Sequence, residues 1–293
     1  ICLKFLGPSP AFGIVPYELF SYWEILPYAV LGVIAAFVAL GFIFLLYKCE
    51  DIFDAWKTPD YLKPAFGGIV VGLIGLYSLD LFGVGYGNTC WMSHMSVNQA
   101  LMGQIGLHAL VIMLVLKMLA TSFTLGSGGS GGVFAPSLFM GSMLGGSFGI
   151  AVHRLFPMIT TLSAADVSGS YALVGMGAAF AAAAHAPIIS IIMLFEMTRD
   201  YTLILPLMVA VVISTVVSRR FSRESIYTRK LSRRGVDIRQ RKQADVMRTI
   251  PVGKAMTKDF PTVSPQMSVQ ELASMMSHTG HHGFPIVDGE GRF

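Results

Sequence analysis

The sequence predicts an all-α polytopic membrane protein with broken and re-entrant helices, followed by a partial α/β domain. Two observations lead to this fold class. Of the 293 residues, 54% are hydrophobic and 13% are charged, whereas a soluble globular chain carries about 25% charged residues. The apolar residues gather in membrane-length segments, several of which are interrupted by Gly, Pro or a single charge. Such interruptions indicate broken helices whose ends form a site inside the membrane.

The apolar segments are uneven in length. Residues 25–46 carry no charge and can form a helix that crosses the roughly 30 Å hydrocarbon core. The polar stretch 47–63 is expected to form a bend. Residues 64–83 form a shorter apolar segment interrupted by Asp80, and 83–104 is mixed and expected to be re-entrant or loop-like. The remaining apolar segments are 105–125, 171–197 and 203–218.

Positive charge is concentrated behind the last apolar segment. From Ser218 onward the sequence contains 14 of its 21 Lys and Arg residues. A basic block after the last span predicts a cytoplasmic location for the carboxyl-terminal region of a multi-pass membrane protein. The sequence therefore divides into a transmembrane region (1–218), a basic cytoplasmic linker (219–251) and a small module (252–293).

The small module carries the signals of one helix and one strand. Ser268, followed by Glu271 three residues later, predicts the N-terminus of a helix through a capping box. Residues 282–292, HGFPIVDGEGR, predict a short apolar strand that leads into an Asp-Gly turn.

Cysteine and histidine residues indicate neither a disulfide framework nor a metal site. The cysteines lie far apart and show no CxxC spacing: Cys2, Cys49 and Cys90. Three histidines are close in sequence in the module: His278, His281 and His282. Without a nearby Cys or a second ligand cluster, we expect structural or incidental roles for them. The sequence starts at Ile1 with no signal peptide, and we expect it to begin and end inside a larger protein.

The stretch 126–146, GSGGSGGVFAPSLFMGSMLGG, begins with a run of glycine and serine residues between two apolar segments. Its first residues match GxGxxG, but a membrane-length segment precedes them and no ribose-binding acid follows about 20 residues later, so a dinucleotide fold is not indicated. The stretch also lacks the GK[ST] of a phosphate-binding P-loop. A flexible linker would have to lie outside the membrane, yet apolar character resumes at once.

A helix N-terminus is the better interpretation of this stretch. Gly131 and Gly132 let the backbone approach closely, and Pro136 fits a first helical turn, where a missing N–H costs nothing. The free N–H groups and positive dipole end of such a helix favour an anion. Glycines every four residues suit close helix packing in lipid: Gly141, Gly145 and Gly149. By these arguments, an anion-binding helix start and a packing helix without a ligand are equally favoured.

In the stretch 126–146 the sequence resembles the CLC chloride channel and transporter family. The GxFxP signature of that family is present here as residues 132–136, GVFAP. Residues 175–206 and 225–231 (SIYTRKL) agree with the family in the same order. The module after Val252 resembles the first portion of a CBS domain, the regulatory module often found behind CLC membrane regions.

The resemblance implies a double-barrelled homodimer with one anion pathway per subunit, built from two inverted halves, of which this chain matches the second. Chloride, the transported ion, is expected to bind the backbone N–H groups of Val133 and Phe134 and the hydroxyl of Tyr227. The other implied partners are membrane lipid and a second copy of the chain, and nucleic acid is not among them. No cofactor, metal or catalytic residue is implied, while adenine nucleotide binding by the CBS module is left open.

The charge pattern suits weak anion binding, because no Arg or Lys lies within 118–150 and a multi-site pathway must also release its ion.

The alternative is a CBS-coupled divalent-cation transporter. It is less favoured because the apolar segments offer few acids, chiefly Asp80 and Glu196, and Glu196 is interpreted as structural or hydrogen-bonded. A membrane enzyme is weaker still, since the spans contain no nucleophile–base pair. The family's first-half motifs, which carry the gating and proton glutamates, are absent, so the resemblance leaves channel and chloride/proton antiporter open.

Overall fold

The computed structural model describes residue 12 and residues 24–85, 96–157, 163–199, 201–233, 235, 250–257, 261–281 and 283–289. The chain divides into two units, Ile1–Gly235 and Val236–Phe293. The boundary between them lies within the predicted basic linker. Each unit is described by itself.

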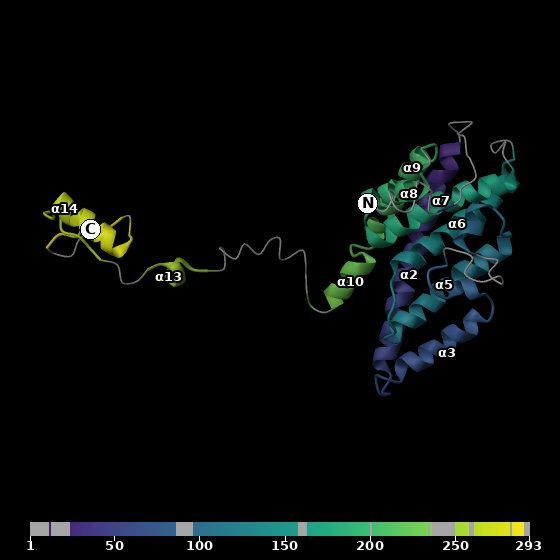
Figure 1. The fold of residues 1–293 in the computed structure, drawn as a ribbon, viewed down its shortest axis with the longest axis horizontal. Helices are drawn as coiled ribbons and strands as arrows, with labels where there is room; N and C mark the ends of the chain where they lie inside the picture. Colours follow the sequence, from purple (N-terminus) through teal and green to yellow (C-terminus); the bar gives the residue numbers. More distant parts are fainter. Residues whose placement is uncertain are drawn as a thin grey trace, which may run out of the picture. The chain divides into compact units, whose positions relative to one another are not determined.

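The first unit is built from helices (Figure 1). They are α2 (Ile25–Ala55), α3 (Lys63–Gly75), η2 (Leu79–Leu81), α4 (Val97–Leu101), α5 (Leu107–Gly126), α6 (Phe134–Leu155), α7 (Ala164–Ala184), α8 (Pro187–Thr198), α9 (Ile204–Phe221) and α10 (Ile226–Arg233). Within the described residues, five stretches are long and apolar enough to cross a membrane, namely α2, α5, α6, α7 and Ile204–Arg233, and the apolar helices α3 and α8 are shorter. The predicted helical membrane fold is confirmed.

Helix α7 forms the centre of this unit. Its residues 167–183 are all buried, and it packs against α2, α6, α8 and α9. A helix that is apolar on all sides is typical of such a buried position. The elements that carry the candidate site are therefore arranged around α7.

The predicted glycine stripe of α6 is the side of that helix that contacts α7. A Cβ atom on Gly141 would lie 2.5 Å from a backbone oxygen of α7, and one on Gly149 would lie 3.0 Å from another. A Cβ atom on Gly145 would overlap with the carbonyl oxygen of Tyr171. Small residues at this spacing let two helix backbones approach closely. The predicted packing role of these glycines is confirmed.

Helix α2 is longer than predicted. The expected helix 25–46 and the first residues of the expected polar bend 47–63 instead form one helix that ends at Ala55. The predicted bend is wrong there because one side of the polar stretch stays in contact with the rest of the unit: Tyr47, Cys49 and Phe53 are buried. The same contacts place the end of α2 beside the candidate site.

The apolar stretch 171–197 is divided between α7 and α8. His185 follows α7 with a left-handed φ of 57°, and α8 begins at Pro187. Proline disfavours helical geometry in the preceding residue, and Ala186 accordingly has φ −126° and ψ 70°. The prediction of broken helices is confirmed at this point.

The charge inside α5 is buried. The Lys117 ammonium donates to the carbonyl oxygens of Leu81 and Gly83, at 3.0 and 2.8 Å. It also lies 4.8 Å from the centroid of the Phe139 ring in α6. The side chain thus joins α5, α6 and the η2 turn.

Several predictions fall partly outside the described residues. Within the expected re-entrant stretch 83–104, residues 86–95 are not described, and its end forms α4, which starts with a capping box of Ser96 and Gln99. The side chain of Asp80 is also outside the described residues. Glu196, expected to be structural or hydrogen-bonded, is exposed on α8 and makes no hydrogen bond or ion pair within the described portion of the chain.

The second unit contains α13 (Val252–Ala255) and α14 (Val269–Thr279). The predicted capping box at Ser268 and Glu271 is present at the start of α14, which confirms that helix start. In the described residues, the predicted strand within 282–292 is reduced to one parallel bridge between Val263 and Ile286. Its two backbone hydrogen bonds run from Val263 N to Pro285 O and from Val287 N to Val263 O, both 3.0 Å.

Candidate anion-binding site

The candidate site begins at the glycine-rich connection between α5 and α6. Ser127 and Gly129 turn the chain back on the end of α5, because their amides donate to the carbonyls of Phe123 and Thr124. Gly128 lies between them with a φ of +88°, which favours glycine over residues with a Cβ atom. The chain then reaches Val133, the N-cap of α6.

The start of α6 leaves backbone donors without a helical partner. The first hydrogen bond of the helix runs from Ser137 N to Val133 O at 3.1 Å, and no side chain caps this end. Among the residues that the structure describes, the amides of Val133 and Phe134 find no acceptor. Pro136 in the first turn has no N–H to satisfy. The helix start therefore offers N–H groups together with the positive end of a helix dipole.

Tyr227 lies in the first turn of α10. Ser225 and Thr228 fix this helix start, because each backbone amide donates to the other residue's hydroxyl, at 2.8 and 3.2 Å. Ile226 points inward and is buried. Tyr227 is 48% exposed, so the surrounding helices do not enclose it.

A cavity of about 240 Å³ brings these two helix starts together. It is lined from the α5–α6 connection by Gly126, Gly131, Gly132 and Val133, from α10 by Ile226, Tyr227 and Lys230, and from the ends of α2 and α5 by Leu46, Tyr47, Glu50 and Leu125. Four of the predicted site residues thus share one cavity although 96 positions separate Gly131 from Tyr227 (227 minus 131).

Two predicted residues take other places. Phe134 does not line the cavity, and its ring packs edge-on against Phe180 of α7, with centroids 5.0 Å apart. Pro136 is buried in the first turn of α6. The role that the resemblance implies for Phe134 concerns its backbone amide, which the ring contact leaves unchanged.

Among the residues that sequence reasoning missed, three bring a polar or charged group to the cavity: Tyr47, Glu50 and Lys230. Residues 118–150 contain no Arg or Lys. However, α10 brings Lys230 to the cavity that the start of α6 also lines. Glu50 supplies the opposite charge there. In the sequence, Tyr47 and Glu50 belong to the polar run YKCED at the end of the first apolar segment, and Lys230 belongs to the stretch SIYTRKL that also holds Tyr227.

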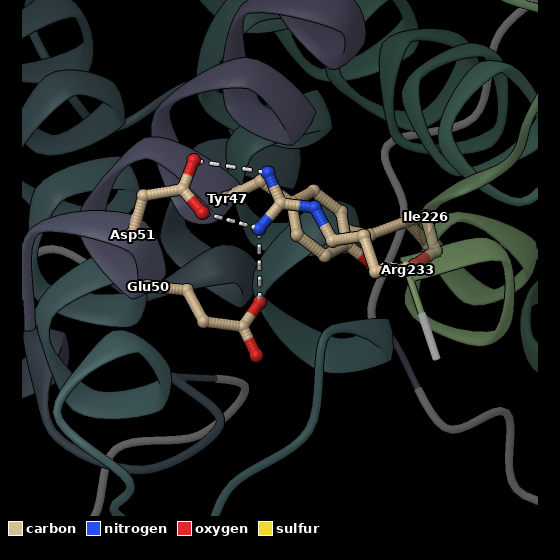
Figure 2. A network of polar contacts seen from close by, with 5 residues as sticks. All are labelled: Tyr47, Glu50, Asp51, Ile226 and Arg233. Atoms are coloured by element: carbon tan, nitrogen blue, oxygen red, sulfur yellow. Dashed lines mark hydrogen bonds and ion pairs between the residues drawn. The ribbon is translucent and has the colours of Figure 1, made fainter. Parts of the chain in front are cut away.

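A network of polar contacts joins α2 to α10 beside the cavity (Figure 2). The Tyr47 hydroxyl donates to the carbonyl oxygen of Ile226 at 2.6 Å, and this hydrogen bond is buried. Arg233 donates to both carboxylate oxygens of Asp51, at 2.6 and 3.0 Å. Its guanidinium also lies 4.0 Å from a carboxylate oxygen of Glu50 and 4.7 Å from the centroid of the Tyr47 ring.

The second unit has an open hollow of about 590 Å³. It is lined by Ser264, Gln266, Met267, Glu271, Ser274, Met275 and His278. Among the described residues of the chain, no three His, Cys, Asp or Glu side chains are grouped so that they could hold a metal ion; His282 lies outside them.

Comparison with protein families identifies both units. The voltage gated chloride channel family matches residues 1–219, and the CBS domain family matches residues 252–293. A putative chloride channel protein ClcB-like from Ralstonia nicotianae is 36% identical over 233 residues, which cover 80% of this chain and 51% of that protein. The H(+)/Cl(-) exchange transporter ClcA of Yersinia pestis is 31% identical over 207 residues, 70% of this chain and 41% of that protein.

Solved structures share the fold. A slow cyanobacterial Cl−/H+ antiporter matches with a TM-score of 0.65 and 26% identity, over 78% of this chain and 51% of that one. A eukaryotic CLC transporter matches in fold with a TM-score of 0.55 and 20% identity, over 92% of this chain and 47% of that one. The chain thus spans about half the length of the relatives it matches.

Proposed function

The chain belongs to the voltage-gated chloride channel family, and from this premise we propose that it forms one half of a pathway for chloride across a membrane. In this proposal the backbone amides of Val133 and Phe134 and the hydroxyl of Tyr227 bind the ion. Gly131 and Gly132 leave room for it, and Pro136 fixes the start of α6.

One observation carries the proposal: the cavity that joins the start of α6 to Tyr227. Chloride needs hydrogen-bond donors, and an amide, a hydroxyl and a helix dipole supply partial positive charge without the tight binding of a full charge facing the ion. A pathway must bind its ion weakly enough to release it. The two charged side chains that line the cavity are of opposite sign, Lys230 and Glu50.

The proposal covers passive conduction and chloride/proton exchange alike. Relatives bear names of both kinds, since the Ralstonia protein is called a putative chloride channel and the Yersinia protein an exchange transporter. Measuring proton movement beside chloride movement separates the two. Coupled proton flux driven by a chloride gradient would identify an exchanger.

We further propose that the CBS module at 252–293 regulates transport from the cytoplasm. In the sequence it follows the transmembrane region and the linker 219–251. Adenine nucleotide is the ligand to test there, and a change of chloride flux on its addition would support regulation.

We also propose a homodimer in the membrane. Several large apolar side chains of α8 and α9 are exposed, and in a membrane they must face lipid, a second copy or the remainder of the full-length protein: Ile188, Ile189, Ile192, Leu205, Met208, Val212 and Val216. The mass of the purified particle in detergent tests the assembly.

The main experiment is flux from liposomes that contain the full-length protein, measured under a chloride gradient and under a magnesium gradient. Chloride flux that Tyr227→Ala reduces or makes less selective would support the proposal. Tyr61→Ala is the matched control, because Tyr61 is exposed in the connection between α2 and α3, outside the cavity. Magnesium flux without chloride flux would instead support the divalent-cation transporter.

A further inference from the structure

Tyr47 stands where the first apolar helix becomes polar, yet its side chain is only 3% exposed. Burying a phenol hydroxyl is unfavourable unless it finds a partner. Here the partner is the carbonyl oxygen of Ile226, at 2.6 Å. That carbonyl belongs to the residue directly before Tyr227, so the hydrogen bond fixes the backbone that carries the candidate ligand.

Apolar contacts place the same point of α10 against α6. Ile226 is buried in a cluster with Leu46 and Tyr47 of α2 and Met140 of α6, and the partly buried Val133 packs on this cluster. Tyr47 therefore contacts the cluster that spans both helix starts of the cavity. Its ring packs in this cluster, and its hydroxyl is hydrogen-bonded to the α10 backbone.

The far end of α10 is fastened to the same segment of α2. Arg233 pairs with Asp51 through both carboxylate oxygens, and its guanidinium lies over the Tyr47 ring (Figure 2). Arg229, one turn earlier, lies 5.3 Å from the centroid of that ring. Exposed ion pairs contribute little stability each. We therefore expect the ion pairs of Arg233 mainly to orient α10. We expect the buried hydrogen bond to fix the position of the α10 backbone along α2.

From these contacts we infer that Tyr47 is a positioning residue for Tyr227: it holds the α10 backbone so that the Tyr227 hydroxyl faces the Val133 amide across the cavity. This inference rests on the proposed function, because it takes Tyr227 to be a chloride ligand. Tyr47 itself lines the cavity, but its hydroxyl is engaged by Ile226.

The test is a double-mutant cycle in the full-length protein with Tyr47→Phe and Tyr227→Phe. Tyr47→Phe removes the hydroxyl and keeps the ring in the cluster. We expect it to weaken chloride binding about threefold to tenfold, the range of one ordinary hydrogen bond, and to change the nitrate-to-chloride selectivity. In the Tyr227→Phe background, Tyr47→Phe should have no further effect on either quantity.

Chloride affinity by calorimetry and selectivity by liposome flux are measured for all four proteins, with Tyr61→Phe as the exposed control. If Tyr227→Phe changes neither quantity, the proposed ligand set fails. If Tyr227→Phe acts but Tyr47→Phe does not, or acts equally in both backgrounds, the positioning role is overturned while the proposed function stands. Thermal unfolding of each variant reports general loss of stability, which cannot by itself produce the expected dependence on Tyr227.

Discussion

Gly145 of α6 lies directly against the carbonyl oxygen of Tyr171 in α7, and a Cβ atom at position 145 would overlap with it. Gly145→Ala should therefore force α6 and α7 apart. Overpacking of a tight contact costs about 2 kcal/mol, so we expect a lower midpoint of thermal unfolding for the full-length protein in detergent.

Gly41→Ala provides the matched control for this change. Gly41 lies within α2, and a Cβ atom there would meet nothing within 4 Å. Alanine is the better helix former by about 1 kcal/mol, so Gly41→Ala should leave stability unchanged or raise it. An equal loss of stability in both variants would contradict the assignment of Gly145 to a backbone contact.

The Phe134 amide can be tested without changing a side chain. Replacing Phe134 by the corresponding α-hydroxy acid turns the amide into an ester and removes only the N–H. Hydrogen bonds to a charged group contribute about 1.5 kcal/mol or more, so chloride affinity should fall about tenfold. The same replacement at Tyr61 serves as the control, and calorimetric titration measures both. Chloride affinity that is unchanged at position 134 would remove Phe134 from the proposed ligands.

Lys117 should hold the turn after α3 in place. Lys117→Met keeps much of the side-chain volume but removes the donors to the carbonyls of Leu81 and Gly83. A buried carbonyl that loses its donor, as that of Leu81 would, costs about 1–3 kcal/mol, so amide hydrogen exchange at residues 79–85 should accelerate. Lys48→Met is the control, because Lys48 is exposed on α2. Unchanged exchange at 79–85 would show that the turn is held by other contacts.

The start of α14 should depend on pH. The amide and hydroxyl of Ser268 both donate to the Glu271 carboxylate at 3.0 Å, and these hydrogen bonds hold the pKa of Glu271 below its ordinary value. A carboxyl whose pKa is lowered by folding stabilises the folded state above its ordinary pKa. That contribution is lost as the pH falls through the lowered pKa.

Hydrogen-exchange protection of α14, corrected for intrinsic exchange rates, should therefore decrease in that acidic range. In Glu271→Gln the decrease should be absent, since the amide does not titrate there. A decrease of the same size in both proteins would mean that another group controls the helix.

Local signals in the sequence predicted the elements whose cause is local. Pro136 and the surrounding glycines indicated the start of α6, and the Ser268–Glu271 spacing indicated the start of α14; both helices begin there. The spacing of Gly141, Gly145 and Gly149 indicated a packing surface, because residues four apart lie on one side of a helix.

Features that depend on distant segments of the chain could not be predicted in this way. The polar stretch 47–63 predicts a bend at Tyr47, and no local signal indicates its hydrogen-bond partner Ile226, which is 179 positions away. Lys230 could not be placed at the cavity from the sequence, because tertiary packing of α10 brings it to a cavity that the distant Val133 also lines. The ligand roles of Val133, Phe134 and Tyr227 stay predictions that the experiments above are designed to test.

The close contact of α6 with α7 has a consequence for ion size. One wall of the cavity is the connection that ends at Val133, the N-cap of α6, and glycine contacts hold α6 against the buried helix α7. The opposite wall is α10, a helix of eight residues that is tied to α2 by a hydrogen bond and an exposed ion pair. We therefore expect a movement of α10, rather than of α6, to change the width of the cavity and with it the radius of the anion that fits.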